Sequence, residues 1–446
     1  MFDTAINNGV VIDPVDGEYA SNIGISNGKI VTVSNNFLEG KRVIDAKGMK
    51  VAPGFIDIHM HGGEISTPSR IDAEMFNYMA LMGVTTCAGG NCGLGDPGIF
   101  AFKKENLPVN YLGFLGHGSL REKAGLRDQY GSAQKNHIEK MTAALEEGLK
   151  SGAVGLSFGL EYIPGTSTEE LLQLSRVVAR HPGKLVSAHY RFDATRSLEA
   201  LAELIIVARE AKVKFQVSHI NSCTAFGRMQ EGLSMLAAAF EAGVDIRADA
   251  YPYDAFSTFV GSAVFDEGCF ENWGAGYDAI EVCEGKYKGK RCTEEIFNYI
   301  RENEPDNLVI AFVMNEDEVV EAIRHPLVMV ASDGYIKDGQ GHPRAAGAFP
   351  RLLGRYVRED NCLDLVTAVK KATLMPAERL GLKSKGRVKE GLDADITVFD
   401  SENIRDKATF QDPTRPPCGI EYVLVNGEEA VRESRLTGRL AGRFMS

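Results

Sequence analysis

The sequence predicts an α/β fold, a (β/α)8 TIM barrel joined to a small β-sandwich domain that both chain termini build. Strand patterns alternate with helix patterns about eight times between residues 53 and 385, as in a parallel barrel with right-handed crossovers. Short β-patterned runs broken by turns occupy both ends of the chain. At 446 residues the chain is also too long for one ordinary core.

The β-patterned termini are residues 1–52 and 386–446. The first contains NIGISNGKIVTV, whose Asn27-Gly28 pair is a hairpin signal, and the second contains EYVLVNGEEAV. Neither piece carries enough apolar surface to fold alone. We therefore expect the two to pair in one β-domain, which the chain leaves near Pro53 and rejoins near Gly386.

The barrel should span residues 53–385. Its expected strands are Phe55–Ile58, Val84–Ala88, Tyr111–Gly116, Val154–Phe158, Leu185–His189, Phe215–His219, Asp245–Tyr251 and Leu327–Ser332. Its expected helices are Ala73–Met82, Ser132–Lys150, Thr168–Ala179, Ser197–Ala211, Met229–Ala242 and Leu363–Thr373. Residues 258–306, which contain the only tryptophan, Trp273, interrupt this series and are expected to form a lid over the barrel mouth.

Composition excludes several classes of protein. Hydrophobic residues at 44% and charged residues at 25% are ordinary globular values, and the net charge of -12 disfavours nucleic acid and anionic membranes as partners. The first residues show no basic segment followed by an apolar run, so we expect a cytoplasmic protein with a small-molecule partner. The eight cysteines are too dispersed for a disulfide scaffold. The oligomeric state stays open, a homo-oligomer included.

Polar residues follow most of the expected barrel strands, where the chemistry of such barrels is placed. Strand side chains alternate between faces, so the two histidines of His-x-His can reach one ion from a strand's end. The residues at these strand ends are His59, His61, Cys92, His117, His189, His219 and Asp333. Three other histidines, His137, His181 and His325, lie on or beside expected helices and should be surface residues.

Together these side chains predict a zinc site. Imidazole, thiolate and carboxylate donors suit Zn2+, which in a catalytic site keeps one position for water. Taken singly, each residue has another interpretation: a satisfied structural histidine, a small buried hydrophobe at Cys92, or a turn-former at Asp333. Asp333 lies in ASDG at a strand-to-turn junction, where its carboxylate can accept the water's proton and pass it to a leaving nitrogen.

These motifs resemble those of the amidohydrolase superfamily, and within it the N-acyl-D-amino-acid deacylases, or D-aminoacylases. The His-x-His motif with later His, His and Asp is shared across the superfamily, whereas GNCG at residues 90–93 is narrower. The resemblance covers nearly the whole chain. It implies a metal-bearing barrel with a small β-domain built from both chain ends.

The resemblance also implies roles for individual residues. Cys92, His189 and His219 would hold one firmly bound zinc. A second, weaker position, whose occupancy stays open, would use His59, His61 and Asp333. The segments ADAYPYDAFST (248–258) and GHPRAAGAFPRLLGRY (341–356) match those that bind the substrate carboxylate, through Tyr251, Ser257 and Arg344. An arginine fork suits a planar carboxylate better than a lysine does.

The sequence departs from its relatives at two places. Strand four offers no lysine of the kind that bridges two metals in many binuclear members, whereas GNCG places Cys92 where its thiolate can bridge two metals or bind one alone. The second barrel histidine is followed by Asn221 where the family usually carries a lysine, and this puts the substrate's side-chain preference in doubt. The GLEYIPG segment (159–165) is also family-like, and we interpret it mainly as strand-four architecture.

The function expected is zinc-dependent hydrolysis of the amide bond of N-acyl-D-amino acids, with Asp333 as general base and acid. One alternative is a hydrolase of cyclic amides, of the dihydroorotase or hydantoinase kind, from the same superfamily. The missing strand-four lysine argues against it. A second alternative, a non-catalytic scaffold, would be expected to have lost ligands, and this chain keeps every one.

Overall fold

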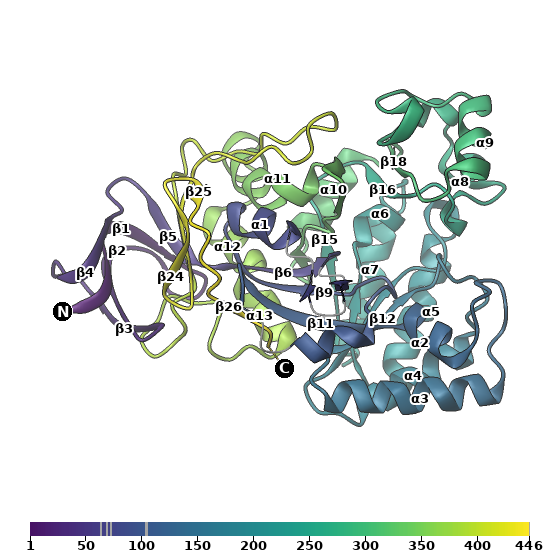
Figure 1. Cartoon of the computed structure of the whole chain (residues 1–446), viewed down its shortest axis with the longest axis horizontal. Coiled ribbons are helices and arrows are strands. Elements are labelled where there is room, and N and C mark those ends of the chain that lie inside the picture. Colours follow the sequence, from purple (N-terminus) through teal and green to yellow (C-terminus); the bar gives the residue numbers. More distant parts are fainter. Residues whose placement is uncertain (63–64, 68–69, 72–73, 103–105, 446) are drawn as a thin grey trace.

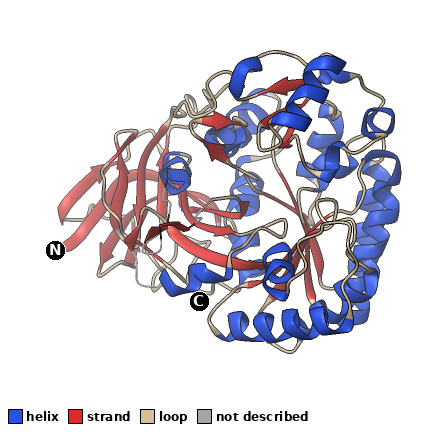
Figure 2. Ribbon diagram, turned by 45° about the vertical axis from the view of Figure 1, so that its right-hand side comes forward, coloured by secondary structure: helices blue, strands red, loops and turns tan. Residues whose placement is uncertain are grey.

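The fold is described by a computed structural model of residues 1–62, 65–67, 70–71, 74–102 and 106–445. Eight parallel strands form its central sheet, in the order β19-β15-β14-β13-β12-β11-β9-β6 (Figures 1 and 2). They are β6 (Phe55–Met60), β9 (Val84–Gly89), β11 (Asn110–Gly116), β12 (Gly155–Gly159), β13 (Leu185–His189), β14 (Lys214–Val217), β15 (Ile246–Ala250) and β19 (Val328–Val330). The predicted fold class is confirmed, and each strand lies within about two residues of its expected range.

The barrel closes where its first strand meets the segment after its last. The amide of Asp333 donates to the carbonyl of His59 at 2.8 Å, and the amide of His61 donates to the carbonyl of Gly334 at 2.9 Å. Met60 and Gly334 form a parallel bridge between them. The residues that complete the ring are therefore also neighbours of the predicted metal ligands.

Helices follow the strands and cover the outside of the barrel (Figure 2). Those that match predicted helices are α1 (Glu74–Leu81), α3 (Lys135–Lys150), α4 (Thr168–Ala179), α5 (Ser197–Ala211), α7 (Met229–Glu241) and α12 (Leu365–Ala372). Ala73, the first residue of one predicted helix, lies outside the described residues. Side-chain caps explain where two of these helices begin. The Ser167 side chain accepts a hydrogen bond from the Glu170 amide at the start of α4, and the Asp364 side chain accepts one from the Thr367 amide at the start of α12.

Among the described residues, five helices outside the 258–306 insertion were not predicted. Four of them are short: α2 (His117–Ala124), α6 (Ile220–Thr224), α11 (Arg344–Arg351) and α13 (Leu374–Leu380). The fifth, α10 (Glu316–Arg324), had a readable signal, because the Asn315 side chain caps it and three acidic residues fill its first turn. A π-helical segment, Leu352–Glu359, continues α11, and the short helices η1 (Pro97–Phe102) and η2 (Ala194–Arg196) lie in loops.

The two chain ends share one sheet, which lies beside the barrel in both views (Figures 1 and 2). Its N-terminal strands are β1 (Phe2–Asp13), β2 (Gly17–Ser26), β3 (Lys29–Ser34), β4 (Gly40–Asp45) and β5 (Lys50–Pro53). Its C-terminal strands are β22 (Ile396–Phe399), β23 (Ile420–Val425), β24 (Glu428–Arg432) and β25 (Arg435–Leu436). Strands β5 and β22 pair antiparallel, so the predicted joining of the two ends is observed.

The apolar faces of this terminal sheet enclose a core separate from that of the barrel, with Val11, Ile23, Val51, Ile396 and Leu424 among its members. The predicted hairpin is present, because Asn27 and Gly28 join β2 to β3 with φ angles of 52° and 70°. Where one domain ends and the next begins, at residues 52 and 386, stays a prediction.

An insertion separates β15 from α10 and stands at the top right of Figure 1. It contains β16 (Phe256–Phe259), η3 (Ala263–Phe265), α8 (Cys269–Trp273), η4 (Tyr277–Ala279), β17 (Ile280–Val282), η5 (Gly285–Tyr287), α9 (Glu294–Asn303) and β18 (Leu308–Ala311). Its strands form an antiparallel sheet in the order β16-β18-β17. An aromatic cluster joins this sheet to α8 and α9, with Trp273 against Phe256 and Phe265. That the insertion moves as a lid stays a prediction.

The remaining strands are two or three residues long: β7 (Ile65–Thr67), β8 (Arg70–Ile71), β10 (Asn106–Leu107), β20 (Ile336–Lys337), β21 (Gln340–Gly341) and β26 (Gly442–Arg443). In the part of the chain that is described, every helix is too short or too polar to cross a membrane.

Candidate metal centre

Six of the seven polar residues predicted at strand ends gather at one end of the barrel. His59 is the fifth residue of β6, His61 follows that strand, and His189 ends β13. The other three lie in the turns that follow β9, β14 and β19: Cys92, His219 and Asp333. All except His61 are more than nine-tenths buried.

His117 is the residue that does not join them. It begins α2, and its Nε2 lies 2.8 Å from Glu170 Oε1 on α4, beside the Arg121–Glu170 ion pair. All three side chains are buried. His117 is therefore a satisfied structural histidine, the interpretation that its sequence position also allowed.

Three of the gathered residues have backbones in the left-handed region, which non-glycine residues rarely adopt. The φ angles are 53° at Cys92, 30° at His219 and 49° at Asp333. Such conformations cost about 1–3 kcal/mol each and persist where surrounding contacts fix them. The His219 amide donates to Asp249 Oδ1 at 2.8 Å, and the Asp333 amide donates to the His59 carbonyl. The turns thus hold the side chains in place at a conformational cost.

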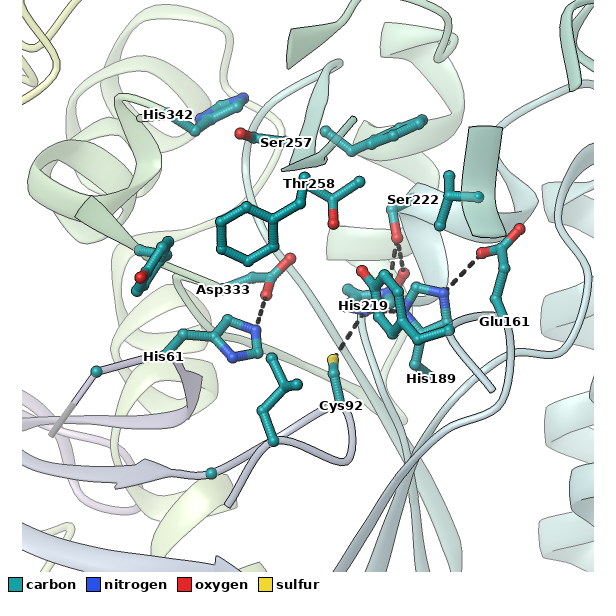
Figure 3. Close-up of a pocket in the computed structure, with 18 of the residues that line it drawn as sticks. His61, Cys92, Glu161, His189, His219, Ser222, Ser257, Thr258, Asp333 and His342 are labelled. Atoms are coloured by element: carbon teal, nitrogen blue, oxygen red, sulfur yellow. Dashed lines mark hydrogen bonds and ion pairs between the residues drawn. The ribbon is translucent and has the colours of Figure 1, made fainter. Parts of the chain in front are cut away.

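The side-chain donor atoms meet at distances that fit a shared metal site (Figure 3). Cys92 Sγ lies 3.3 Å from His59 Nε2 and 3.6 Å from His219 Nε2. His189 Nδ1 lies 2.9 Å from His219 Nε2. Ligands of a tetrahedral zinc stand about 3.3–3.7 Å apart, given Zn–N near 2.0–2.1 Å and Zn–S near 2.3 Å. The two Cys92 distances fall in this range and the His189–His219 distance is shorter, so the donor types and the Cys92 spacing fit the ion.

Two overlapping positions can be distinguished. Cys92, His189 and His219 form one set whose ligand atoms lie within 4.8 Å of one another, and His59, His61 and Cys92 form another. A further group of three, His59, His219 and Asp333, meets the same limit and links the two. Asp333 Oδ1 lies 3.0 Å from His61 Nε2 and 3.3 Å from His59 Nε2. Cys92 belongs to both sets, so its thiolate can serve either position or both.

The electrostatics show that this site attracts positive charge. Burial opposes ionisation of Cys92, yet His59 and the other imidazoles hold the pKa of its thiol well below the usual value. Burial likewise opposes ionisation of Asp333, but Arg344 and then His59 keep its pKa well below normal. Despite burial, Asp333 and Cys92 raise the pKa of His61 to about 9. A buried thiolate and carboxylate are thus balanced here by cations, and a divalent metal can replace the protons.

Partners behind three histidines fix which ring nitrogen faces the centre. His189 Nε2 lies 2.7 Å from Glu161 Oε2, and His219 Nδ1 lies 2.6 Å from Ser222 Oγ. His59 Nδ1 lies 3.1 Å from Asp249 Oδ1. Each contact leaves the other nitrogen for the metal, as is common for metal-ligating histidines.

Sequence reasoning missed these partners. Glu161 lies in GLEYIPG, which we interpret from the sequence mainly as strand-four architecture. That interpretation is wrong for Glu161, because this residue lines the cavity and contacts His189. An isolated acidic residue just beyond the fourth strand was the signal. Asp249 and Ser222 carry no comparable signal: Asp249 meets His59 from a strand far along the chain, and Ser222 reaches His219 only through the turn that begins α6.

Changing Glu161 to Gln should weaken zinc binding at the Cys92, His189 and His219 position by about 10- to 100-fold, the usual cost of losing such a partner. Glutamine keeps a hydrogen-bonding oxygen but removes the charge that makes the imidazole a better ligand. Chelator competition would measure the zinc affinity. Glu203→Gln is the matched control, because Glu203 pairs with Arg191 at 2.8 Å and contacts no ligand. Equal zinc affinity in the two variants would contradict the role of Glu161.

Two of the three residues predicted to bind a carboxylate line the cavity. Arg344 and Ser257 both line the cavity, and the Arg344 Nη2 donates to the Ser257 carbonyl at 3.4 Å. Arg344 Nη1 also lies 2.9 Å from Asp333 Oδ2. The Tyr251 ring, wholly buried, lies behind the guanidinium at 4.4 Å and is not among the described residues of the cavity wall. Tyr251 thus supports Arg344 and does not itself face the cavity.

Two further residues near Arg344 clarify this side of the cavity. His342 was not predicted; it lines the cavity, and its Nδ1 accepts from the Arg344 amide at 3.0 Å. Asn221, at the position where the family resemblance predicts a lysine, donates from Nδ2 to the Tyr251 carbonyl at 3.0 Å. Asn221 is fully buried and links α6 to the end of β15. Its side chain is not among the described residues that line the cavity.

The cavity above the centre has a volume of about 240 Å³, suited to a small molecule. Figure 3 shows Cys92, His189 and His219 on its floor, with Ser257 and His342 on the opposite side and Glu161 behind His189. The insertion contributes Phe256, Ser257, Thr258, Phe259, Val264 and Leu308 to its walls.

Comparison with known proteins identifies the family. A model of the amidohydrolase family matches residues 42–273 and 303–431. The chain belongs to the amidohydrolase family. This amidohydrolase shares 31% sequence identity with a D-aminoacylase of Alcaligenes xylosoxydans xylosoxydans. The alignment covers 100% of this chain and 98% of the relative. The predicted resemblance is therefore confirmed.

Solved structures agree with this membership. The amidohydrolase resembles an N-acyl-D-glutamate deacylase of Bordetella bronchiseptica, solved with zinc and a phosphonate mimic of the tetrahedral intermediate. The TM-score is 0.88 at 29% identity, covering 100% of this chain and 99% of the other. It also resembles a D-aminoacylase with a binuclear metal centre, in which one metal activates the enzyme and a second metal attenuates it. That TM-score is 0.88 at 30% identity, with both chains fully covered.

Proposed function

We propose that this amidohydrolase is a zinc-dependent deacylase that cleaves the amide bond of N-acyl-D-amino acids to a carboxylate and a free D-amino acid. One observation carries the proposal: a Cys–His metal-ligand set, a carboxylate and an arginine meet in one small cavity, with Asp333 contacting both His61 and Arg344. The relatives that act on N-acyl-D-amino acids support the substrate class.

In this proposal Cys92, His189 and His219 hold one zinc tightly, and His59, His61 and Asp333 form the second, weaker position. When bound, zinc supplies a Lewis acid that polarises a carbonyl group and makes water more acidic. Glu161, Ser222 and Asp249 orient the imidazoles towards the ion. The relative with a binuclear centre, activated by one metal and attenuated by a second, supports this division.

Asp333 moves the proton. Its carboxylate is ionised, since Arg344 and the histidines keep its pKa well below normal. It accepts a proton as water attacks the acyl carbon and donates that proton to the departing amide nitrogen. Arg344 Nη1, at 2.9 Å, keeps the carboxylate directed into the cavity.

Arg344 and Ser257 bind the α-carboxylate of the substrate. The Nε of Arg344 is buried without a hydrogen-bond partner among the described residues, so the guanidinium has donors left for a ligand. Tyr251 holds the guanidinium plane from behind. With the carboxylate fixed at Arg344 and the acyl oxygen near the metal, only one enantiomer can place its side chain without a clash.

Arg344→Lys should raise KM by about 10- to 100-fold, because a lysine cannot form the bidentate pair with a carboxylate and charged hydrogen bonds contribute about 1.5–3 kcal/mol. Steady-state kinetics with an N-acetyl-D-amino acid would measure this change. Arg351→Lys is the control: Arg351 donates to the Pro252 carbonyl at 2.7 Å and does not line the cavity. An unchanged KM in Arg344→Lys would place the carboxylate elsewhere.

The test of the function is amine release from paired N-acetyl-D- and N-acetyl-L-amino acids, with zinc analysis of the same sample. We expect turnover of D substrates only. Hydantoin and dihydroorotate should be tested in parallel for formation of their ring-opened N-carbamoyl products, because the ring-hydrolase alternative shares the fold. Strand β12 (GLSFG) carries no lysine, which disfavours that alternative. Ring opening of these cyclic amides, with no cleavage of the linear N-acetyl substrates, would replace the proposal.

A cytoplasmic location is proposed with the function. All eight cysteines are free thiols, which suits a reducing compartment.

A further inference from the structure

One wall of the cavity is apolar and comes entirely from the insertion. Phe256 and Phe259 on β16, Val264 on η3 and Leu308 on β18 all line the cavity. Phe256, Val264 and Leu308 are more than nine-tenths buried, whereas Phe259 is half-buried. We refer to these four residues as the insertion wall.

The insertion wall is fixed from behind. The Phe256 and Trp273 ring centroids are 5.6 Å apart, and Trp273 Nε1 donates to Asp193 Oδ2 at 2.6 Å. Asn272 Nδ2 donates to the other oxygen of Asp193, also at 2.6 Å. Asp193 belongs to the loop after β13, so this contact ties the insertion to the barrel. A preformed apolar wall can bind an apolar group without the cost of ordering it.

The charges around the cavity are unfavourable for a second carboxylate on the substrate. The carboxyl groups of Glu161 and Asp193 line it, and so does that of the exposed Asp96. Among the described lining residues, Arg344 is the one lysine or arginine, and the proposed α-carboxylate occupies it. Lys337 Nζ approaches the Phe259 ring at 5.9 Å, but it donates to the Asp306 carbonyl at 2.8 Å and lies 3.3 Å from Glu284.

We infer that the insertion wall is the side-chain subsite and that it selects N-acyl-D-amino acids with apolar side chains, such as leucine, methionine and phenylalanine, over those with acidic side chains. The inference rests on the proposed function and narrows its substrate. An acidic side chain would be buried among aromatic rings and carboxylates, and an unpaired buried charge is strongly disfavoured.

The first test compares kcat/KM for the N-acetyl derivatives of D-leucine, D-methionine, D-phenylalanine, D-glutamate, D-aspartate and D-lysine. We expect the apolar substrates to exceed the two acidic ones by at least about 100-fold, the scale of an unpaired buried charge. Turnover of the D-glutamate or D-aspartate derivative comparable to that of the apolar substrates would overturn the inference while leaving the deacylase function intact. D-lysine as the best substrate of the panel would overturn it as well, because the wall would then not select apolar side chains. Turnover of none of the six would instead count against the deacylase function.

The second test changes the wall itself. Phe259 is the best position, because it is half-buried and its ring meets Tyr335 at 6.0 Å on the cavity side. Phe259→Arg should raise kcat/KM for N-acetyl-D-glutamate relative to N-acetyl-D-leucine by about 10-fold or more, by supplying a partner for the acid. Phe259→Leu, the matched control, should keep the preference of the parent. If Phe259→Arg kept its zinc and its fold but left the ratio of kcat/KM for the two substrates unchanged, the side chain of the substrate would have to bind elsewhere.

Discussion

Replacing Cys92 by alanine should remove the tightly bound zinc and lower turnover by about 10³-fold or more. Cys92 Sγ lies within 3.6 Å of two imidazole nitrogens, and no strand-four lysine can take its place. Loss of a Lewis acid removes several kcal/mol of transition-state stabilisation, and each 1.36 kcal/mol is about tenfold in rate. Metal analysis of the purified variant, with kinetics on the same sample, would measure both effects.

Cys87→Ala provides the control for this experiment. Cys87 is a fully buried thiol on β9, five residues before Cys92, and it does not line the cavity. Its replacement leaves a small void in the core but should keep the zinc and the activity. Full zinc occupancy in Cys92→Ala would show that Cys92 is not a ligand.

Asp333→Asn should lower kcat by about 10²- to 10⁴-fold, the usual contribution of a general acid-base group. The tight position uses Cys92, His189 and His219, so zinc there should remain. The fold should also remain, because the barrel-closing hydrogen bond to the His59 carbonyl comes from the backbone of Asp333. Steady-state kinetics, zinc analysis and circular dichroism on one preparation would separate these outcomes.

Asp96→Asn is a suitable comparison, because Asp96 also lines the cavity but its Oδ1 accepts from the Gly98 amide at 2.7 Å. Its kcat should stay within a few-fold of the parent. If Asp333→Asn retained comparable activity, another group would have to carry the proton.

The barrel and the gathering of its ligands could be predicted because both follow from short-range pattern. Apolar runs of strand length alternate with helical periodicity, and the polar residue after each run must lie at the same end of a parallel barrel. His59, Cys92, His189 and Asp333 all followed this rule. His117 occupied an equivalent position, yet Glu170 on a neighbouring helix binds it, which no local pattern reveals.

The roles of several site residues depend on the direction in which their side chains point, and neighbouring residues in the sequence do not determine that direction. Tyr251 follows β15 as predicted, but its ring faces the back of Arg344 and not the cavity. Asn221 likewise binds backbone at the end of β15, although a lysine is expected at its position. Glu161 was recognisable only as an acidic residue after a strand, and its role required the position of His189 on the adjacent one.

The closing seam of the barrel has a consequence for its local unfolding. Two peptide hydrogen bonds join the first strand to the segment after the last one, and they involve His59, His61, Asp333 and Gly334. Of these residues, His59, His61 and Asp333 are also the proposed ligands of the weaker metal position. Opening the seam would pull those ligands apart. An ion bound there, but not to the opened form, stabilises the closed ring by mass action. Occupancy of the weaker position would thus set how often the barrel opens, a role separate from any part it plays in catalysis.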